Sequence, residues 1–241
     1  MRRFAGITLI AAATVGAMAL STLSAAAQDN KKGDANGALM GYKHIVVIYE
    51  ENHSFDNLFG MWGAVNGRPV NGLSSAPPAR TVQVNQTGTP FTCLLQNDVN
   101  LTSPPLAPTC SDSTTATTFG SAFVNSPFPI NNYIKPTDTT CPPPGVFAAH
   151  GVLNGTGLPG GCTADLVHRY YQEQYQLNGG NMNRYVTGSD AIGLSMGYYD
   201  TTKLPIYQYL HGKDAPNYVI ADNFFQAAFG GSFLNHQFLI A

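Results

Sequence analysis

The sequence predicts an α/β layered fold, because strand-like and helix-like segments alternate along the chain. Residues 44–49 form a run of β-branched and aromatic side chains after His44, which is typical of a central parallel strand covered on both faces. Residues 218–222 predict a second buried strand. Helical patterns follow both segments, as in layered α/β proteins. Two strands are too few to complete a sheet, so we expect the fold within this chain to be incomplete.

The chain begins with the three parts of a secretory signal peptide. Two arginines make a short basic start, residues 4–20 are apolar, and a small-residue cleavage site precedes Gln28. A membrane anchor is the alternative, but polar and glycine residues interrupt the apolar part, and we favour cleavage. We therefore expect a secreted or periplasmic protein in which residues 1–27 are removed and residues 28–41 form a flexible leader.

The charge of the chain does not favour a nucleic-acid partner. The sequence contains 12 basic and 14 acidic residues, a formal net charge of −2. Loss of Arg2 and Arg3 with the signal leaves 10 basic residues against 14 acidic ones, a charge of −4, which is unsuited to general binding of phosphate backbones. No later segment is long and apolar enough to span a bilayer, so we expect no integral membrane segment after cleavage.

Four cysteines follow the signal, and an even number in an exported chain predicts two disulfides. They are Cys93, Cys110, Cys141 and Cys162. Three pairings are possible, and we favour the local ones, Cys93 with Cys110 and Cys141 with Cys162. The spacing lacks the C-x-x-C knuckles of a structural zinc site, so zinc binding by these thiolates is not expected.

All four cysteines lie in a long region, residues 66–162, that is rich in Pro, Thr, Ser and Gly and shows little periodicity. A long irregular segment in a compact protein is typical of functional loops. We therefore expect a loop-rich insertion that forms a lid or a set of active-site loops, held in place by the disulfides.

Local signals predict helices on both sides of this region. Ser54 is expected to cap a helix that runs through Phe59. Residues 166–177 place apolar and aromatic side chains on one helical face, with Asp165 as the expected cap. Residues 204–210 predict another helix that begins near its proline.

Acidic and amide side chains follow directly after the first predicted strand. Glu50, Glu51 and Asn52 stand where ligands bind in open α/β sheets, beyond the carboxyl end of a strand. Carboxylate and amide oxygens at that edge are suited to a hard cation. The alternative is that these residues are only the solvated end of a strand.

A glycine turn after the second predicted strand presents a serine. Gly230 and Gly231 allow a sharp turn, and Ser232 then opens a helix whose free N–H groups suit a phosphate or an oxyanion. The turn differs from the nucleophile elbow of serine hydrolases, because Leu234 stands where that motif requires glycine. A serine at a helix start can also be a plain N-cap.

Several of these blocks together resemble a known family. Residues 44–60, HIVVIYEENHSFDNLFG, resemble the opening motif of the bacterial phosphoesterase family, which includes secreted acid phosphatases and phospholipases C. The pattern returns, in the same order, at residues 196–200, 204–207, 221–225 and 230–236. The resemblance covers most of residues 42–241, and the serine in the last block is closer to the acid phosphatase branch than to the phospholipase branch.

The resemblance implies a fold and a set of roles. Residues 42–241 would be the N-terminal part of a catalytic domain with the three-layer α/β/α sandwich of the alkaline phosphatase-like superfamily. Glu51 and Asn52 match its divalent-metal ligands, and Ser232 matches a nucleophile that also contacts the metal. His168 resembles an early active-site histidine that stabilises the transferred phosphoryl group. For His168 the alternative is a histidine on a helix face, satisfied by a neighbouring side chain.

Other parts of the family's metal site have no counterpart in this sequence. Family members carry two further metal-binding aspartates and a late histidine in a C-terminal half. Residues 238–241 are apolar and show no helix-ending signal. We therefore expect this chain to be the first part of a longer protein and, by itself, to be inactive or nearly so.

The sequence supports three hypotheses on function. The first is metal-dependent hydrolysis of phosphate esters through a phosphoserine on Ser232, acting on a small phosphate ester as an acid phosphatase or on a phospholipid as a phospholipase C. The second is a metal-free serine esterase with His236 or His211 as its base. The third is a non-catalytic secreted module that binds through the disulfide-pinned loops.

Overall fold

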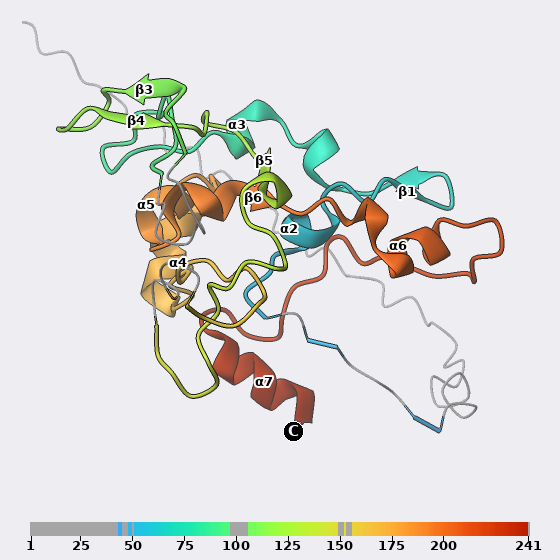
Figure 1. Ribbon diagram of the computed structural model, residues 1–241. Coiled ribbons are helices and arrows are strands. Elements are labelled where there is room, and N and C mark those ends of the chain that lie inside the picture. Colours follow the sequence, from blue (N-terminus) through green and yellow to red (C-terminus); the bar gives the residue numbers. More distant parts are fainter. Residues whose placement is uncertain are drawn as a thin grey trace, which may run out of the picture. The chain divides into compact units, whose positions relative to one another are not determined.

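The computed structural model describes residues 43–44, 48–49, 51–96, 106–148, 152 and 156–240 (Figure 1). The chain divides into two units, Met1–Ile48 and Tyr49–Ala241. The predicted signal peptide and leader lie outside the described residues, as do residues 45–47 of the first predicted strand. All helices and strands given below belong to the second unit.

Short helices separated by turns make up most of the regular structure. The α-helices are α2 (Phe55–Phe59), α3 (Pro78–Thr81), α4 (Tyr170–Leu177), α5 (Tyr185–Gly188), α6 (Pro205–Leu210) and α7 (Ser232–Ile240). Single turns of 3₁₀-helix lie between them at Leu73–Ser75, Ile130–Asn132, Asn178–Gly180, Ile192–Met196 and Thr201–Lys203. In the described part of the chain, no helix is both long enough and apolar enough to cross a membrane.

The strands form three small two-stranded sheets. Antiparallel pairs join β1 (Ala64–Val65) to β2 (Arg68–Pro69) and β3 (Cys110–Asp112) to β4 (Phe119–Ser121). A parallel pair joins β5 (Phe128–Pro129) to β6 (Gly197–Tyr198), across 68 residues of sequence from Pro129 to Gly197 (Figure 1). The structure is therefore of the mixed α/β class, but its small sheets do not form the expected three-layer sandwich within the described residues.

Of the first predicted strand only residues 44, 48 and 49 are described, and they are not in a strand; the second predicted strand, residues 218–222, does not form. Ile48 and Tyr49 are not in a strand, and the Ile48 side chain is 78% exposed. Residues 218–222 are extended but unpaired, and Val219 is 91% exposed. The reason is physical: a parallel strand needs hydrogen-bonding neighbours from other segments, and no described segment pairs with either of these.

The region expected to form a lid or a set of active-site loops contributes most of the hydrophobic core. Six of its side chains join the buried cluster, namely Phe91, Leu94, Phe123, Phe128, Ile130 and Ile134. They pack with Ala164, Val186, Ala191 and Leu194 from the segment that follows. Phe123 and Phe128 stack face to face with ring centroids 4.4 Å apart. The apolar residues of this region lack periodicity because short strands and turns, rather than long helices, bring them together.

Two disulfides hold this region, and both join the cysteines that are local in sequence. Cys93 pairs with Cys110, and Cys141 pairs with Cys162. These are the favoured pairings of the three that the sequence allows. The first disulfide includes Cys110 of β3, and the second joins two cysteines 21 positions apart in the sequence.

The predicted helices form, but α4 begins later than predicted. Ser54 caps α2 by accepting a hydrogen bond from the Asn57 N–H at 3.1 Å, and α6 begins at Pro205 as expected. The prediction of Asp165 as the cap of α4 is wrong, because α4 begins at Tyr170 after Arg169. The Asp165 carboxylate instead accepts from the Val167 N–H at 2.9 Å, closing a turn in which Val167 has a φ of +53°.

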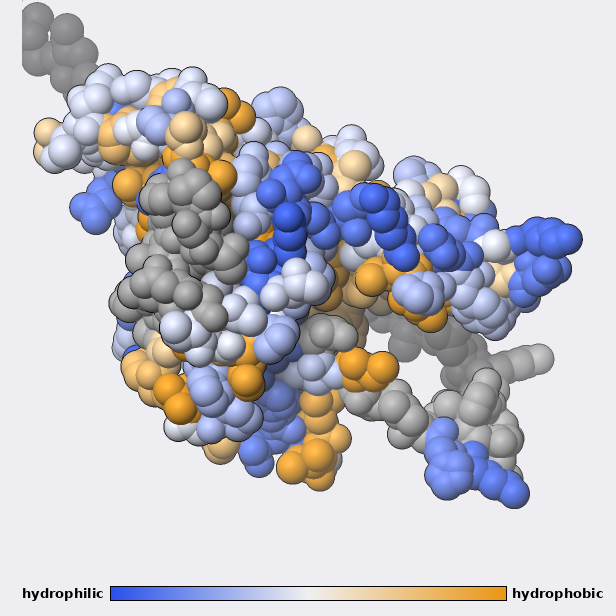
Figure 2. All heavy atoms as spheres, viewed as in Figure 1, coloured by the Kyte–Doolittle hydropathy of each residue, from blue (hydrophilic) through white to orange (hydrophobic). Residues whose placement is uncertain are grey.

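Many apolar side chains between residues 219 and 240 lie on the surface. Phe225 and Phe233 are 83% and 77% exposed, and Asn235 is the buried residue of α7. Figure 2 shows hydrophobic side chains gathered over this helix. The segments at this end of the chain are thus held by polar contacts and turns rather than by burial.

Candidate active site

A tight turn places Glu51 and Asn52 ahead of α2. The Glu51 N–H donates to the Tyr49 carbonyl at 3.2 Å, and Asn52 adopts a φ of +64°, a left-handed conformation that asparagine tolerates better than most residues. His53 then contacts Asn57, with Nδ1 and Oδ1 2.6 Å apart. The turn and the first turn of α2 therefore form one locally hydrogen-bonded unit.

Asn57 fastens this unit to β6. The Asn57 side-chain amide donates to the Gly197 carbonyl at 2.8 Å, and the Asn57 backbone carbonyl accepts from the Tyr199 N–H at 2.7 Å. These two bonds join the opening block of the sequence to the block at residues 196–200, which lies 140 residues further along. The position of Glu51 and Asn52 is thus set by long-range contacts as well as by the local turn.

The glycine turn before Ser232 is held by an asparagine one turn into α7. Gly230 and Gly231 have φ values of +94° and +72°, so side chains would be strained at both positions. The buried Asn235 side chain accepts from the Ala228 N–H at 3.0 Å and donates to the Ala228 carbonyl at 2.9 Å. Asn235 therefore clamps the turn that presents Ser232 at the start of α7.

The side chains of His168 and Glu51, from two distant segments, meet at Ser232. Its Oγ lies 3.4 Å from His168 Nε2, which in turn lies 3.8 Å from Glu51 Oε1. These residues and Asn52 line one cavity of about 350 Å³, whose walls also include Glu173. The structure thus brings together Glu51, Asn52, His168 and Ser232, the site residues predicted from the sequence.

His236 also belongs to this cluster, where it contacts Glu51 rather than Ser232. Its Nε2 lies 2.8 Å from Glu51 Oε2, and its ring packs on Tyr49 with centroids 4.5 Å apart. From the sequence, His236 supports Ser232 as a nucleophile and is a possible base of a serine esterase, whereas its contact with Glu51 was not predicted. Its spacing of one helical turn from Ser232 was the available signal, because residues at i and i+4 share one face of a helix.

His211, the other base considered for a serine esterase, lies elsewhere. Its Nε2 contacts the Trp62 carbonyl at 3.0 Å, and its ring stacks on Tyr207 at 3.7 Å. These contacts fix His211 beside α6 and away from the cavity that contains Ser232. The described geometry therefore offers Ser232 one adjacent histidine, His168.

The cluster favours an ionised Glu51. Hydrogen bonds from the Ser232 hydroxyl and from His236 lower the pKa of Glu51 below its ordinary value of 4.5, against the opposing effect of desolvation. The nearby imidazoles of His236 and His168 act in the same direction. His168 has a second acidic neighbour, since its Nδ1 lies 3.6 Å from Asp165 Oδ1.

The donor atoms fit a hard divalent cation. Glu51, Asn52 and Ser232 offer a carboxylate, an amide oxygen and a hydroxyl oxygen within one cavity, the ligand chemistry that such ions prefer. Within the described residues, no group of three or more His, Cys, Asp or Glu side chains forms a metal site. The candidate ligands thus include only one carboxylate, so they would leave coordination positions open.

Comparison with known proteins gives one match. Residues 42–241 match the sequence profile of the Phosphoesterase family. The chain belongs to the phosphoesterase family. Curated proteins and solved structures gave no match. Membership in the phosphoesterase family implies a hydrolase that acts on phosphate esters, and the matched range contains Glu51, Asn52, His168 and Ser232.

Proposed function

We propose that this phosphoesterase is an exported, metal-dependent enzyme of the acid phosphatase type, with Ser232 as its nucleophile. The observation that carries the proposal is the meeting of Ser232, His168 and Glu51 in one cavity, with 3.4 Å between Ser232 Oγ and His168 Nε2. The disulfides support export, because such bonds form in oxidising compartments. Serine rather than threonine at position 232 favours the acid phosphatase branch over the phospholipase C branch.

Ser232 is placed to attack a phosphorus atom held at the start of α7. Its own N–H and those of the next residues have no partner inside the helix, so they can donate to phosphoryl oxygens. In the first step a bond forms between Ser232 Oγ and phosphorus, while the bond to the ester oxygen breaks and the alcohol leaves after taking up a proton. In the second step a water oxygen bonds to phosphorus, the bond between Ser232 Oγ and phosphorus breaks, Oγ regains a proton from the attacking water, and inorganic phosphate is released.

The other side chains orient and stabilise these steps. The Ser232 hydroxyl donates to the Glu51 carboxylate, which directs the serine lone pairs towards the cavity. His168 Nε2 lies close enough to donate to an oxygen of the transferred phosphoryl group. The Asp165 carboxylate lies near the other ring nitrogen, with its Oδ1 3.6 Å from His168 Nδ1.

Glu51, Asn52 and Ser232 would hold the divalent metal. When bound, the metal supplies positive charge that lowers the pKa of the serine hydroxyl and neutralises phosphate oxygens. A hard cation takes about six ligands or more, so we propose that the complete site needs donors in addition to Glu51, Asn52 and Ser232. On this proposal the 241-residue chain binds metal weakly and turns over slowly.

The described contacts do not favour the two rival functions. The two histidines considered as the base of a metal-free esterase are engaged elsewhere, His236 with Glu51 and His211 with Trp62, and the histidine beside Ser232 is instead His168. A binding module based on disulfide-pinned loops is not favoured either, because that region supplies much of the core.

Hydrolysis by the full-length gene product tests the proposal. We expect activity on p-nitrophenyl phosphate that a chelator abolishes and divalent metal restores. Activity on a bis-ester and on a p-nitrophenyl carboxylate ester should be lower by at least about tenfold. Faster hydrolysis of the bis-ester would favour the phospholipase C type, and chelator-resistant hydrolysis of the carboxylate ester would overturn the proposal.

A further inference from the structure

His236 contacts the candidate metal ligand Glu51 from the helix that also carries Ser232. Its Nε2 lies 2.8 Å from Glu51 Oε2, and its ring packs on Tyr49 with centroids 4.5 Å apart. An ionised carboxylate can only accept hydrogen bonds, so the donor in this contact is His236 Nε2. One oxygen of the Glu51 carboxylate is therefore already bonded within the protein.

The two oxygens of the Glu51 carboxylate have different surroundings. Oε2 is bonded to His236, whereas Oε1 lies 3.8 Å from His168 Nε2, the atom that is 3.4 Å from Ser232 Oγ. Ser232 also donates to the carboxylate and stands four residues before His236, and residues so spaced share one face of a helix. A single turn of α7 therefore holds Glu51 at two points, with Oε1 on the side of the nucleophile.

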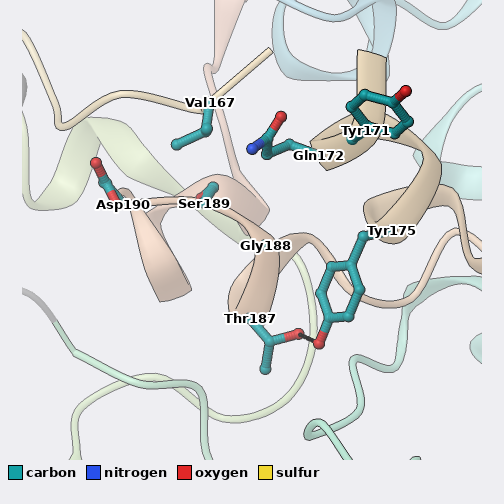
Figure 3. Close-up of a pocket in the computed structure, with 8 residues that line it drawn as sticks. All are labelled: Val167, Tyr171, Gln172, Tyr175, Thr187, Gly188, Ser189 and Asp190. Atoms are coloured by element: carbon teal, nitrogen blue, oxygen red, sulfur yellow. Dashed lines mark hydrogen bonds between the residues drawn. The ribbon is translucent and has the colours of Figure 1, made fainter. Parts of the chain in front are cut away.

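His168 is held less firmly than His236. Asp165 Oδ1 lies 3.6 Å from His168 Nδ1, too far for a hydrogen bond, and this buried nitrogen has no hydrogen-bond partner within the described residues. The neighbouring Val167 lines a second cavity of about 400 Å³ (Figure 3), whose wall includes Ser189. The buried Ser189 hydroxyl likewise has no hydrogen-bond partner in the described part of the chain. The segment that carries His168 thus borders open space, and His236 is the firmer support of the two.

We infer that His236 is a positioning residue, which fixes Glu51 so that this carboxylate binds the divalent cation through one oxygen, Oε1. The inference rests on the proposed function, because it assumes the metal site formed by Glu51, Asn52 and Ser232. Hydrogen bonds to a ligating carboxylate orient it, and the loss of such a partner typically lowers metal affinity by roughly 10–100-fold. Binding through one oxygen also leaves more coordination positions of the ion for phosphate oxygens than binding through two.

Calorimetric titration of the full-length gene product with Mg²⁺, Mn²⁺, Ca²⁺ and Zn²⁺ tests this inference without reliance on activity. We expect His236→Leu, which keeps apolar bulk against Tyr49 but cannot donate, to lower the affinity for the best-binding ion by about tenfold or more. His236→Gln should retain most of the affinity, because its amide can donate to Glu51. Equal affinities in the Leu and Gln variants would overturn the inference.

Two glutamines provide matched controls. Gln237 is the exposed neighbour of His236 on α7, and Gln172 lies on α4 at the second cavity (Figure 3). Gln237→Ala and Gln172→Ala should leave metal affinity unchanged. A loss in either control as large as that in His236→Leu would show a general effect on the fold, and would contradict a specific role of His236. Circular dichroism spectra that match the unchanged protein identify the variants that are folded.

Infrared spectra report how the carboxylate binds, which a merely structural role of His236 would not alter. A carboxylate bound to a metal through one oxygen has a wider separation between its antisymmetric and symmetric stretching bands than one bound through two. The difference between metal-loaded and metal-free protein should show the wide separation, in bands that Glu51→Gln removes. These bands should change in His236→Leu and persist in His236→Gln. A narrow separation in the unchanged protein would overturn the inference.

The results also separate this inference from the proposed function. Metal binding that depends on His236, in a protein without phosphatase activity, would overturn the proposed function and support the inference. Metal-dependent phosphatase activity, with an affinity that His236→Leu does not alter, would overturn the inference alone. Failure of all four ions to bind would overturn both.

Discussion

Glu51 is the side chain on which most contacts of the candidate active site converge. One carboxylate oxygen lies 2.8 Å from His236 and the other 3.8 Å from His168, while the Ser232 hydroxyl donates to the same group. Together these partners keep the pKa of Glu51 below 4.5. A carboxylate that stays ionised in mildly acidic solution can bind a cation under conditions in which an ordinary glutamate begins to protonate.

Replacing this carboxylate should therefore weaken metal binding. We expect Glu51→Gln to reduce the affinity for Mg²⁺, Mn²⁺, Ca²⁺ or Zn²⁺, whichever binds best, by about tenfold or more, since an amide keeps the shape but loses the charge. Isothermal titration calorimetry measures this directly, without reliance on activity. Asp214→Asn removes an exposed carboxylate outside the cavity and is the matched control. Equal loss in both variants would show a general charge effect rather than a ligand role.

Among the elements, the β3–β4 hairpin is held to residues 92–93 by a buried carboxylate. Asp112 is fully buried, and its Oδ1 accepts from the Thr114 N–H and hydroxyl at 2.8 and 2.7 Å. Its Oδ2 accepts from the N–H groups of Thr92 and Cys93. Burial alone would raise the pKa of Asp112, but these donors outweigh it and hold the pKa below 3.8.

Asp112 should therefore make stability depend on pH in a defined window. Because its pKa is lower in the folded chain than in the unfolded chain, its contribution is present above about pH 4 and is lost as the pH falls through the folded value. We expect Asp112→Asn to lower the free energy of unfolding by about 1.5–3 kcal/mol at pH 7. The difference from the unchanged chain should shrink as the pH falls below about 4 in urea denaturation. A difference that stays constant over this range would contradict the assignment.

The elements also show which parts of the fold are predictable from sequence. The start of α2 at its Ser54 cap, the start of α6 at Pro205 and the opening of α7 after the glycine pair all follow from local chemistry. The predicted strand at residues 218–222 does not form, because strand pairing depends on partners far away in sequence, and residues 45–47 of the other predicted strand lie outside the described residues. The start of α4 was missed because a side-chain turn at Asp165 competes with the helix.

In the candidate site, too, local motifs reveal some residues, whereas contacts between distant segments are not predictable from them. Glu51, Asn52 and Ser232 could be proposed because each sits in a local motif that matches a family pattern. The contact between His236 and Glu51 spans 185 residues, so no local pattern could reveal it. The unsatisfied hydroxyl of Ser189 is likewise a property of packing, which a single sequence does not encode in any short motif.

At the scale of the whole molecule, residues 66–162 are an integral part of the fold. Gln83 is fully buried and links this region to α5, since its side-chain oxygen accepts from the Tyr185 N–H at 2.8 Å. Phe123 packs against both Phe128 and Tyr133 in the core. A lid could be removed with little effect on stability, whereas a core segment could not.

Substitutions at two adjacent residues can show whether residues 66–162 behave as a core segment or as a lid. Phe123 is 2% exposed and Val124 is 57% exposed. We expect Phe123→Ala to lower the free energy of unfolding by about 3–5 kcal/mol, because it leaves a cavity in the core. Val124→Ala should change it by about 0.5 kcal/mol or less. Similar small effects in both variants, measured by urea denaturation, would show that the region behaves as a lid after all.

The most direct test of the account is whether Ser232 becomes phosphorylated during turnover. The full-length gene product is mixed with p-nitrophenyl phosphate and quenched in acid within milliseconds, and its peptides are then analysed by mass spectrometry. The account predicts one phosphoserine, at Ser232, which forms with metal, is absent with chelator and is absent in Ser232→Ala. His168→Ala should slow its formation while Ser232 remains the labelled residue. Turnover at a near-normal rate by Ser232→Ala would contradict the central claim, because a serine that only caps α7 would leave the chemistry intact.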